Sequence, residues 1–237
     1  MTETVRLTKR LIQQINCSRR EAELYIEGGW VTVDGEVIEL PQFQVGEQVV
    51  ALLPGANTTA AGPITVIMNL AADLNKEQTL AQLIMNNRWP QDISGGRLLK
   101  RHLLHIKPCL PLLPGIQGMQ ILSQHWGAQR KYAEDGERLE QEFVVDVQGT
   151  LAADKLALLN HGLNYLGEKL PPAKVSWQTE TRLRFALKNP LAGQIQSMCE
   201  QVGLKILAIK RIRIGATALG KIALGQWRFL DTSKGIY

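Results

Sequence analysis

The sequence predicts an α+β protein in which a small N-terminal domain precedes a larger, mixed and mainly antiparallel domain. Two helices and a hairpin can be read in residues 1–53, whereas strands predominate after residue 62 and several follow one another directly. Between these regions, residues 54–62 (PGANTTAAG) are small, polar or helix-breaking, which is typical of a linker. We therefore expect domains at 1–53 and 63–237, separated by this linker.

The elements of the N-terminal domain are indicated by apolar spacing and by a capping pattern. Apolar residues at helical spacing after Thr8 predict a first helix. Ser18 and Glu21 lie in S-R-R-E, a capping box that opens a second helix. A hairpin is expected over 30–38, because Asp-Gly lies between two β-rich runs, and a short strand is expected over 48–53.

Beyond the linker, alternating and helical patterns define the expected elements. Phe143, Val145 and Val147 alternate as in a strand, and Ile195, Met198 and Cys199 share one helical face. In chain order we expect a strand over 64–69, a short helix over 80–85, strands over 119–123 and 141–147, a helix over 151–162, one or two strands over 174–187, a helix over 192–202, and strands over 204–214 and 223–230.

Composition excludes several classes of protein. A chain of 237 residues with 45% hydrophobic and 21% charged residues can bury a core, unlike a disordered tail. Three widely spaced cysteines, without C-x-x-C or zinc spacing, argue against a disulfide scaffold and a structural metal. The first residues lack an apolar signal core, and the long uncharged runs are broken by proline and glycine. We expect a cytoplasmic protein with no membrane association.

Positive charge is unevenly distributed along the chain. The net charge of +5 permits a nucleic-acid partner without requiring one. Residues 170–237 carry 11 basic and 3 acidic residues, a net of +8. The stretch from Ile93 to Ala133 contains no Asp or Glu, although it holds six Lys or Arg residues and three histidines. Either a solvated loop or a phosphate-facing surface would explain this stretch.

Three motifs in the N-terminal domain resemble the S4 RNA-binding module: R-L-T-K-R-L (6–11), C-S-R-R-E-A (17–22) and G-G-W-V-T-V-D-G (28–35). In that family two helices present basic side chains to folded RNA. The resemblance implies RNA contacts by Lys9, Arg10, Ser18, Arg19 and Arg20. Trp30 stands where the family commonly has a basic residue, and we expect its ring to pack rather than to stack on a base.

The rest of the chain resembles the small ribosomal RNA pseudouridine synthases that carry an N-terminal S4 module. The motifs are K-R-I-R-I-G (210–215), A-L-G-K-I-A-L-G-Q-W-R-F-L (218–230), Q-I-x-x-M-C-E-x-x-G (194–203) and L-E-Q-E-F-V-V (139–145). Such enzymes flip a uridine out of RNA, detach its base, rotate it and rejoin it through carbon, without a cofactor. The resemblance implies an essential aspartate, a supporting arginine on a later helix and a base-stacking aromatic, here Phe143.

Aligned with the family it resembles, this sequence is expected to lack the catalytic pair. Aligning on G-M-Q-I-L-S-Q (118–124) puts Leu113 at the aspartate position, 30 residues before Phe143. A rival alignment on G-R-L-L-K-R (96–101) puts Leu99 there instead. The supporting arginine is replaced by Gln196. Loss of both members is coherent, because an arginine without its carboxylate would be a buried, unpaired charge. We expect no catalytic residues.

These observations favour an RNA-binding protein, a monomer that binds structured, ribosomal RNA with catalysis lost. Its expected RNA surface joins the S4 cations to Arg97, Lys100, Arg101, Lys210, Arg211 and Arg213. Strand alternation would place Lys210 opposite both Arg211 and Arg213. His102, His105 and His125 are expected on the surface or facing RNA rather than in catalysis.

Two alternatives stay open. The first is an active pseudouridine synthase that uses a remote acid such as Asp92 or Asp73. The second is a ribosome-assembly interaction module in which RNA binding is incidental.

Overall fold

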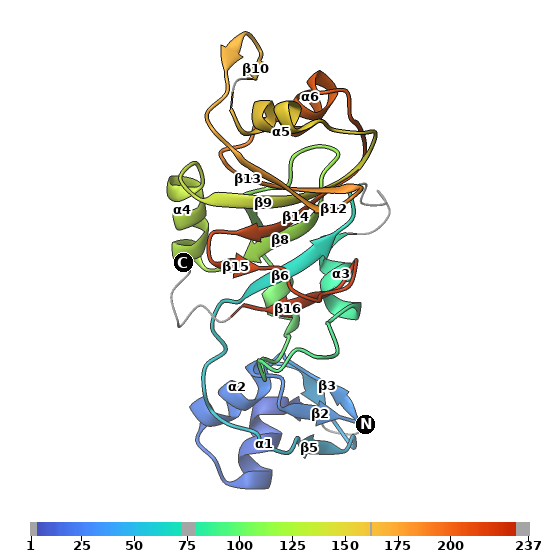
Figure 1. The fold of residues 1–237 in the computed structure, drawn as a ribbon. Coiled ribbons are helices and arrows are strands. Elements are labelled where there is room, and N and C mark those ends of the chain that lie inside the picture. The colour runs from blue at the N-terminus through green and yellow to red at the C-terminus, as the bar shows by residue number, and fades with distance from the viewer. Residues whose placement is uncertain (1–3, 73–78, 162, 231–237) are drawn as a thin grey trace. The chain divides into compact units, whose positions relative to one another are not determined.

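The chain folds into two compact units in a computed structural model that describes residues 4–72, 79–161 and 163–230 (Figure 1). The N-terminal unit comprises Met1–Pro63 and Arg97–Leu104, and the C-terminal unit comprises Ile64–Gly96 and His105–Tyr237. Arg97–Leu104, here called the return segment, is thus separated in sequence from the rest of its unit. The expected domain boundary at 54–62 assigned these residues to the C-terminal domain, whereas the structure groups them with the N-terminal unit.

The N-terminal unit is built from two helices and short strands. Its elements are β1 (Val5–Arg6), α1 (Leu7–Ile15), α2 (Arg19–Glu27), β2 (Val31–Val33), β3 (Glu36–Val37), β4 (Gln44–Val45), β5 (Val50–Leu52) and the 3-10 helix η1 (Lys100–Leu103). The strands pair in the order β3-β2-β5, and β1 pairs with β4. Leu7 and Leu11 of α1 pack with Ala22 and Ile26 of α2 over the valines of β2, which makes a small apolar core.

The capping box predicted for the second helix is present. The Ser18 hydroxyl accepts a hydrogen bond from the Glu21 N–H at 3.2 Å, and the Glu21 carboxylate accepts one from the Ser18 N–H at 2.8 Å. This bond to the Ser18 backbone lowers the pKa of Glu21. The cap fixes where α2 begins, and therefore where Arg19 and Arg20 leave the helix.

The C-terminal unit is organised around one large sheet. Its elements are β6 (Thr65–Leu70), α3 (Leu80–Asn86), β7 (Lys107–Cys109), β8 (Gln117–Ser123), α4 (Trp126–Asp135), β9 (Glu140–Gln148), α5 (Ala153–Asn160), β10 (Asn164–Tyr165), β11 (Glu168–Lys169), β12 (Lys174–Thr179), β13 (Arg182–Lys188), α6 (Gln194–Gln201), β14 (Lys205–Ile214), β15 (Thr217–Ala218) and β16 (Trp227–Phe229). Among the described residues the sheet order is β12-β13-β9-β14-β8-β6-β16, with β15 on β14 and β7 on β8.

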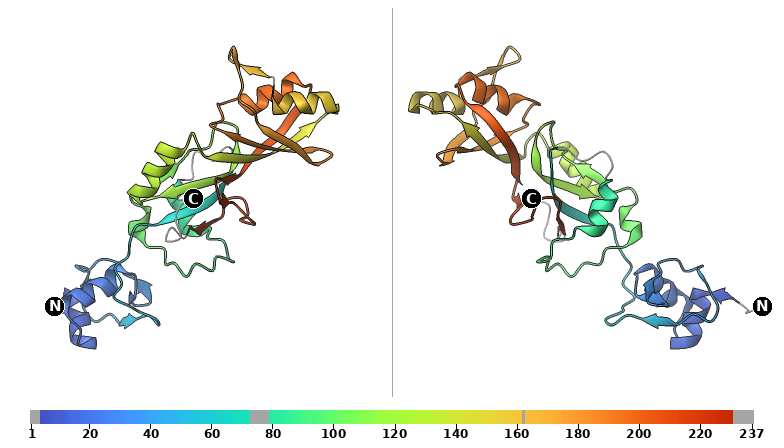
Figure 2. Two further views of the ribbon diagram at one scale, coloured as in Figure 1. Left: turned by 60° about the vertical axis from the view of Figure 1, so that its left-hand side comes forward. Right: turned by 90° about the vertical axis from the view of Figure 1, so that its right-hand side faces the viewer.

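Strands β8 and β14 run parallel, and the other described pairings of this sheet are antiparallel. The predicted α+β class with a large, mainly antiparallel sheet is therefore confirmed. Helices α5 and α6 lie on one face of the sheet near β13 (Figures 1 and 2). They bury an apolar cluster with β9 and β13 that includes Phe143, Phe185 and Ile195.

A glycine allows β8 and β14 to come together. Gly118 is paired with Arg211, and a Cβ atom at Gly118 would lie 2.4 Å from the Arg211 carbonyl oxygen. Its φ of +107° is also one that other residues rarely adopt. The close approach of these strands brings the start of β8 against the Arg211 side chain.

Within the described residues, no helix is long and apolar enough to cross a membrane.

Candidate functional site

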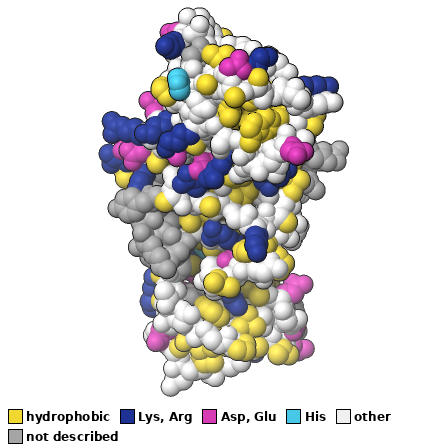
Figure 3. Space-filling view, in the orientation of Figure 1, with side chains coloured by type: hydrophobic (Ala, Val, Ile, Leu, Met, Phe, Trp, Pro, Cys, Tyr) yellow, Lys and Arg dark blue, Asp and Glu magenta, His cyan; other side chains and the backbone are white. Residues whose placement is uncertain are grey.

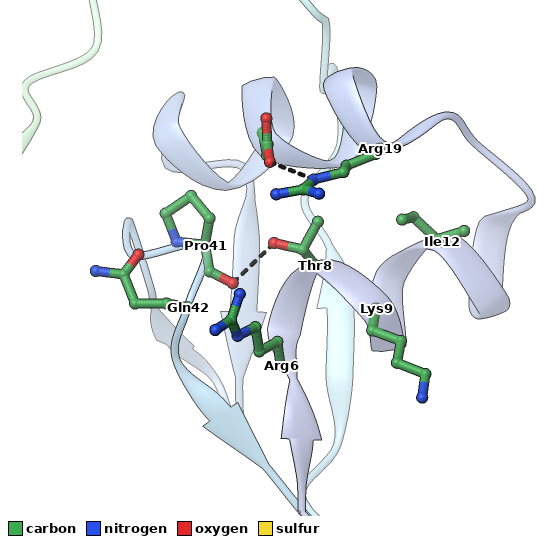
Figure 4. Close-up of a pocket in the computed structure, with 8 residues that line it drawn as sticks. Arg6, Thr8, Lys9, Ile12, Arg19, Pro41 and Gln42 are labelled. Carbon is green, nitrogen blue, oxygen red and sulfur yellow. Dashed lines mark hydrogen bonds and ion pairs between the residues drawn. The ribbon is translucent and has the colours of Figure 1, made fainter.

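A pocket of about 320 Å³ opens on the N-terminal unit between α1, α2 and the 41–42 loop (Figure 4). Its basic lining comes from three places: Arg6 at the end of β1, Lys9 in α1 and Arg19 in α2. The Thr8 hydroxyl donates to the Pro41 carbonyl at 2.7 Å, which ties the loop to the helix. Three exposed cations around one hollow make a surface suited to phosphate oxygens.

One carboxylate reaches this pocket. Glu23 accepts a hydrogen bond from the Arg19 Nε at 3.0 Å, one turn along α2. Because Arg19 is largely exposed, this pair is weak and can be exchanged for a phosphate contact.

The other residues predicted from the S4 resemblance lie in different surroundings. Arg10 is half-buried, and its guanidinium donates to the Gly46 carbonyl at 2.6 Å, outside the pocket lining. Ser18 and Arg20 are exposed, and the Ser18 hydroxyl is used in the helix cap. Arg6 belongs to the pocket although it was not among the predicted contacts. Its position in R-L-T-K-R-L, three residues before Lys9, was the signal available.

The return segment places three predicted cations on the N-terminal unit. Arg97 lies over the ring of Trp30 and donates to the Gly29 carbonyl. The Lys100 N–H donates to the Glu39 carboxylate at 2.9 Å, and Arg101 approaches Glu27 at 4.0 Å. The Arg97 guanidinium therefore has protein partners in the N-terminal unit.

His102 is a buried part of the return segment rather than a surface residue. It is 4% exposed, and its Nδ1 accepts the Leu99 N–H at 3.1 Å. Burial lowers the pKa of His102, and the nearby Arg101 charge lowers it further. The expectation that this histidine lies on the surface or faces RNA is wrong. His105 is exposed, and His125 caps α4 by accepting the Ala128 N–H on Nδ1 at 3.2 Å.

The 110–113 loop, which carries Leu113, is held by a buried arginine. Arg211 is 2% exposed, and its guanidinium donates to the Leu110 carbonyl at 2.8 Å and the Met119 carbonyl at 2.9 Å. Further bonds reach Gln141 Oε1 at 2.9 Å and the Pro111 carbonyl at 3.4 Å. These acceptors are all uncharged. Burial lowers the pKa of Arg211 to about 10, so the group still carries its charge at neutral pH.

A buried glutamine holds the same loop from β8. Gln120 Oε1 accepts the Leu112 N–H at 3.0 Å, and its Nε2 donates to the Cys109 carbonyl at 3.0 Å. Leu113 is half-buried and packs against the apolar cluster that contains Phe143 and Ile195. Phe143 itself is 1% exposed, so its ring faces the core. A stacking role for Phe143 stays a prediction, and it requires the ring to become accessible.

Gln196, at the predicted arginine position, points along its own helix. It is exposed on α6, and its Nε2 donates to Glu200 Oε1 at 3.0 Å. The next residue, Ser197, accepts a bond from Gln201 at 3.1 Å. This part of α6 therefore presents neutral amides and one carboxylate.

A β-bulge corrects the expected arrangement of the basic residues in β14. Arg211 pairs with Phe143, but the register then shifts so that Arg213 pairs with Glu142, and Lys210 pairs with Val144. Directly paired residues share a sheet face. Because of the bulge, Arg213 lies on the same sheet face as Lys210, and the buried Arg211 lies on the opposite face. Simple alternation had predicted that Arg213 and Arg211 would share a face.

On that face Arg213 takes part in a ladder of opposite charges. The nearly buried carboxylate of Glu142 accepts hydrogen bonds from both Arg213 and Arg184. Asp146 accepts one from Arg182 Nε at 2.6 Å. On the face of the larger unit that Figure 3 shows, acidic side chains lie among the basic ones. Among the described residues, no three His, Cys, Asp or Glu side chains gather as metal ligands.

Comparisons with known proteins place this chain beside RNA-modifying enzymes. It is 26% identical over 238 residues to the dual-specificity RNA pseudouridine synthase RluF of Salmonella typhi, covering 97% of this chain and 77% of the relative. The Escherichia coli K12 RluF is also 26% identical, with 96% and 76% covered. The ribosomal small subunit pseudouridine synthase A of Salmonella typhimurium LT2 is 25% identical, with 94% and 95% covered.

A solved structure agrees with these relatives. The crystal structure of a pseudouridylate synthase superposes with a TM-score of 0.57 at 17% identity, covering 97% of each chain. No family model matches the sequence. The chain is therefore homologous to the RNA pseudouridine synthase RluF and to the ribosomal small subunit pseudouridine synthase A. It has the pseudouridylate synthase fold.

Proposed function

We propose that this protein binds structured ribosomal RNA through a retained pseudouridine synthase scaffold and no longer isomerises uridine. The observation that carries the proposal is the residue at position 113. A leucine has no group that can attack a base or exchange a proton, whatever its surroundings.

No acid close to Leu113 in the sequence is available to take its place. Arg211 and Gln120 hold the backbone on both sides of this loop, and the Leu113 side chain packs on apolar neighbours. The nearest carboxylates along the sequence are Asp92 and Glu134. A slip of a few residues in the alignment would still bring an uncharged residue to this position.

Gln196, at the position expected for the supporting arginine, also supports the loss of catalysis. An arginine that serves an aspartate stabilises its ionised form. The amide of Gln196 cannot do so, and it is bonded to Glu200 on the outside of α6. Losing the aspartate removes the reason to keep the arginine, so the two changes belong together.

The remote acid Asp92 is fully occupied in the structure. Its Oδ2 accepts from Arg88 Nε at 3.0 Å and from the Phe229 N–H at 3.2 Å, and its Oδ1 accepts from the Ser94 N–H at 3.0 Å. Burial would raise the pKa of Asp92, but bonds from Ser94 and Phe229 and the Arg88 charge outweigh it and lower the pKa. A carboxylate so engaged holds a loop together and is poorly placed to attack. Asp73 lies outside the described residues.

RNA binding is supported by the pocket on the N-terminal unit, which we propose is an S4 module. Arg6, Lys9 and Arg19 surround it, the Thr8 bond ties α1 to the 41–42 loop, and the Ser18 cap fixes the start of α2. Cations positioned by rigid helices suit folded RNA, whose phosphates are themselves fixed.

The test is a pseudouridine map of ribosomal RNA from a deletion strain and its parent. We expect identical maps, together with ribosomal RNA crosslinked to the wild-type protein. Loss of modification at one uridine, restored by the purified protein, would establish the active-enzyme alternative instead. RNA affinity that stays flat as salt rises would favour the interaction-module alternative, because phosphate contacts weaken with salt.

A further inference from the structure

We propose that α4 provides a second RNA contact, in which an unpaired base stacks on the indole of Trp126 beside the Arg130 guanidinium. The inference rests on the proposed RNA-binding function and adds a single-strand site in the C-terminal unit. Neither the sequence motifs nor the pocket on the N-terminal unit includes this helix.

Trp126 is exposed to an extent that packing does not explain. Its side chain is 69% exposed, whereas Trp227, in the same unit, is completely buried. Among the described large hydrophobic side chains that are exposed, Trp126 is the sole aromatic. Holding a large apolar ring in water forgoes the free energy of burying it. An exposed indole with a guanidinium beside it has the chemistry of a stacking platform for a base.

The indole of Trp126 is contacted by an arginine of the same helix. The guanidinium carbon of Arg130 lies 5.3 Å from the centroid of Trp126, one turn along α4. Arg130 Nε in turn donates to Glu134 Oε1 at 2.5 Å. The residues at 126, 130 and 134 therefore form a stacked row along one side of α4.

The start of the helix is also fixed by a cap. His125 Nδ1 accepts the Ala128 N–H and caps α4. The imidazole fits against the turn because residue 127 is glycine, where a Cβ atom would lie 2.9 Å from His125 Cε1. An ordered ring loses little entropy when a base stacks on it.

The charges around Trp126 favour a nucleotide over an apolar protein segment. No Asp or Glu occurs from Ile93 to Ala133, so the acids of α4, Glu134 and Asp135, lie at the end of the helix away from Trp126. Helix α4 packs against β7, which begins with the exposed Lys107. The Arg130–Glu134 pair has both side chains more than half exposed, so a phosphate can compete for Arg130. Aromatic rings beside arginine are the common platform for unpaired bases.

The experiment compares two RNAs that differ only in an unpaired end. One is a short RNA hairpin with a blunt end, and the other is the same hairpin with a single-stranded oligouridine tail. Binding of the full-length protein is measured by fluorescence anisotropy for wild type, Trp126→Ala and Trp126→Phe. Leu158→Ala is the matched control, because Leu158 is also an exposed apolar residue on a helix, at 45%.

We expect the tail to tighten binding by wild type, and Trp126→Ala to weaken binding of the tailed hairpin by roughly tenfold. Binding of the blunt hairpin should be unchanged in Trp126→Ala. Trp126→Phe should keep most of the gain, because it retains an aromatic face, and Leu158→Ala should keep all of it.

Two results would overturn the inference while leaving RNA binding intact: a tail that adds nothing to wild-type affinity, or a gain that survives Trp126→Ala. If wild type binds neither RNA, the proposed function fails as well. A Trp126-dependent dimer in sedimentation, without any effect of the tail, would assign the ring to a second copy of the chain instead.

Discussion

The guanidinium carbon of Arg97 lies 4.0 Å from the ring centroid of Trp30, although the two residues are far apart in the sequence. A basic residue is expected at position 30 from the S4 resemblance, and here a tryptophan stands there with an arginine laid over it. A positive charge of the return segment therefore lies against the side chain at position 30. The expectation that Trp30 packs, rather than stacks on a base, agrees with this contact.

Removing Arg97 should loosen the return segment. Arg97→Ala deletes the stacking contact and the bond to the Gly29 carbonyl, and should cost about 1 kcal/mol of local stability. Hydrogen exchange measured by mass spectrometry should show faster exchange in peptides covering 97–104. Arg20→Ala, at an exposed position of α2, is the control. Equal exchange in Arg97→Ala and wild type would show that the other contacts of the segment, among them Leu99, His102 and the Lys100–Glu39 bond, hold it without Arg97.

The pocket cations should contribute to RNA binding through phosphate contacts. Lys9→Ala and Arg19→Ala should each weaken binding to structured RNA and reduce the slope of log affinity against log salt by about 1. Arg10→Ala is a useful contrast, since Arg10 bonds the Gly46 carbonyl and its loss should lower stability more than the salt slope. An unchanged slope in the double variant Lys9→Ala/Arg19→Ala would remove this pocket from the RNA surface.

Arg211 should be a principal stabilising residue of the C-terminal unit. Arg211→Met leaves the Leu110 and Met119 carbonyls and Gln141 without their donor, and should lower the free energy of unfolding by about 3 kcal/mol. Urea unfolding measures this loss, with Lys210→Met on the opposite sheet face as the control. If the urea concentration at half-unfolding were the same for Arg211→Met and wild type, water would be satisfying the hydrogen-bond acceptors that Arg211 leaves.

Introducing an aspartate and an arginine at the two positions that the alignment assigns to the catalytic pair tests this alignment directly. Leu113→Asp alone places a carboxylate beside apolar neighbours and should cost about 2 kcal/mol. Adding Gln196→Arg should recover part of this loss and produce pseudouridine in ribosomal RNA from the deletion strain. Additive destabilisation with no product and no change in RNA binding would mean that position 113 is not the aspartate position.

Acid should destabilise the return segment through His102. The pKa of His102 is below its ordinary value of 6.5, so the unfolded state binds the proton more tightly than the folded state. Stability should therefore fall as pH decreases from about 6.5. His102→Asn keeps an acceptor for the Leu99 N–H but does not titrate, and its melting temperature should depend less on pH. Identical pH profiles would assign the acid sensitivity to other groups.

Local sequence signals predicted the local structure well. The S-R-R-E motif led to the observed start of α2, and the Asp-Gly turn to the β2–β3 hairpin. The alternation of Phe143, Val145 and Val147 led to β9. Each signal depends on a few neighbouring residues, and the free energy that enforces it is local too.

Other features of the structure could not be predicted from the sequence, because most of them depend on contacts between residues that are far apart in the chain. The helix α4 was not expected, because its few apolar residues give no clear stripe. The bulge in β14 and the burial of Arg211 follow from pairing with β9 and β8. The return segment belongs to the N-terminal unit through Trp30, Gly29 and Glu39, which lie about sixty residues earlier in the sequence.

The return segment has a consequence for how such proteins can be recombined. The chain passes from one unit to the other after residues 63, 96 and 104. A module joined to the rest of a chain by a single link can be exchanged as one continuous piece between genes. Here a fragment ending at Pro63 would lack Leu99, a buried residue of its own unit, so transplanting the module requires two separate stretches of coding sequence. Gene fusions at the linker should therefore yield partners with an incomplete N-terminal unit.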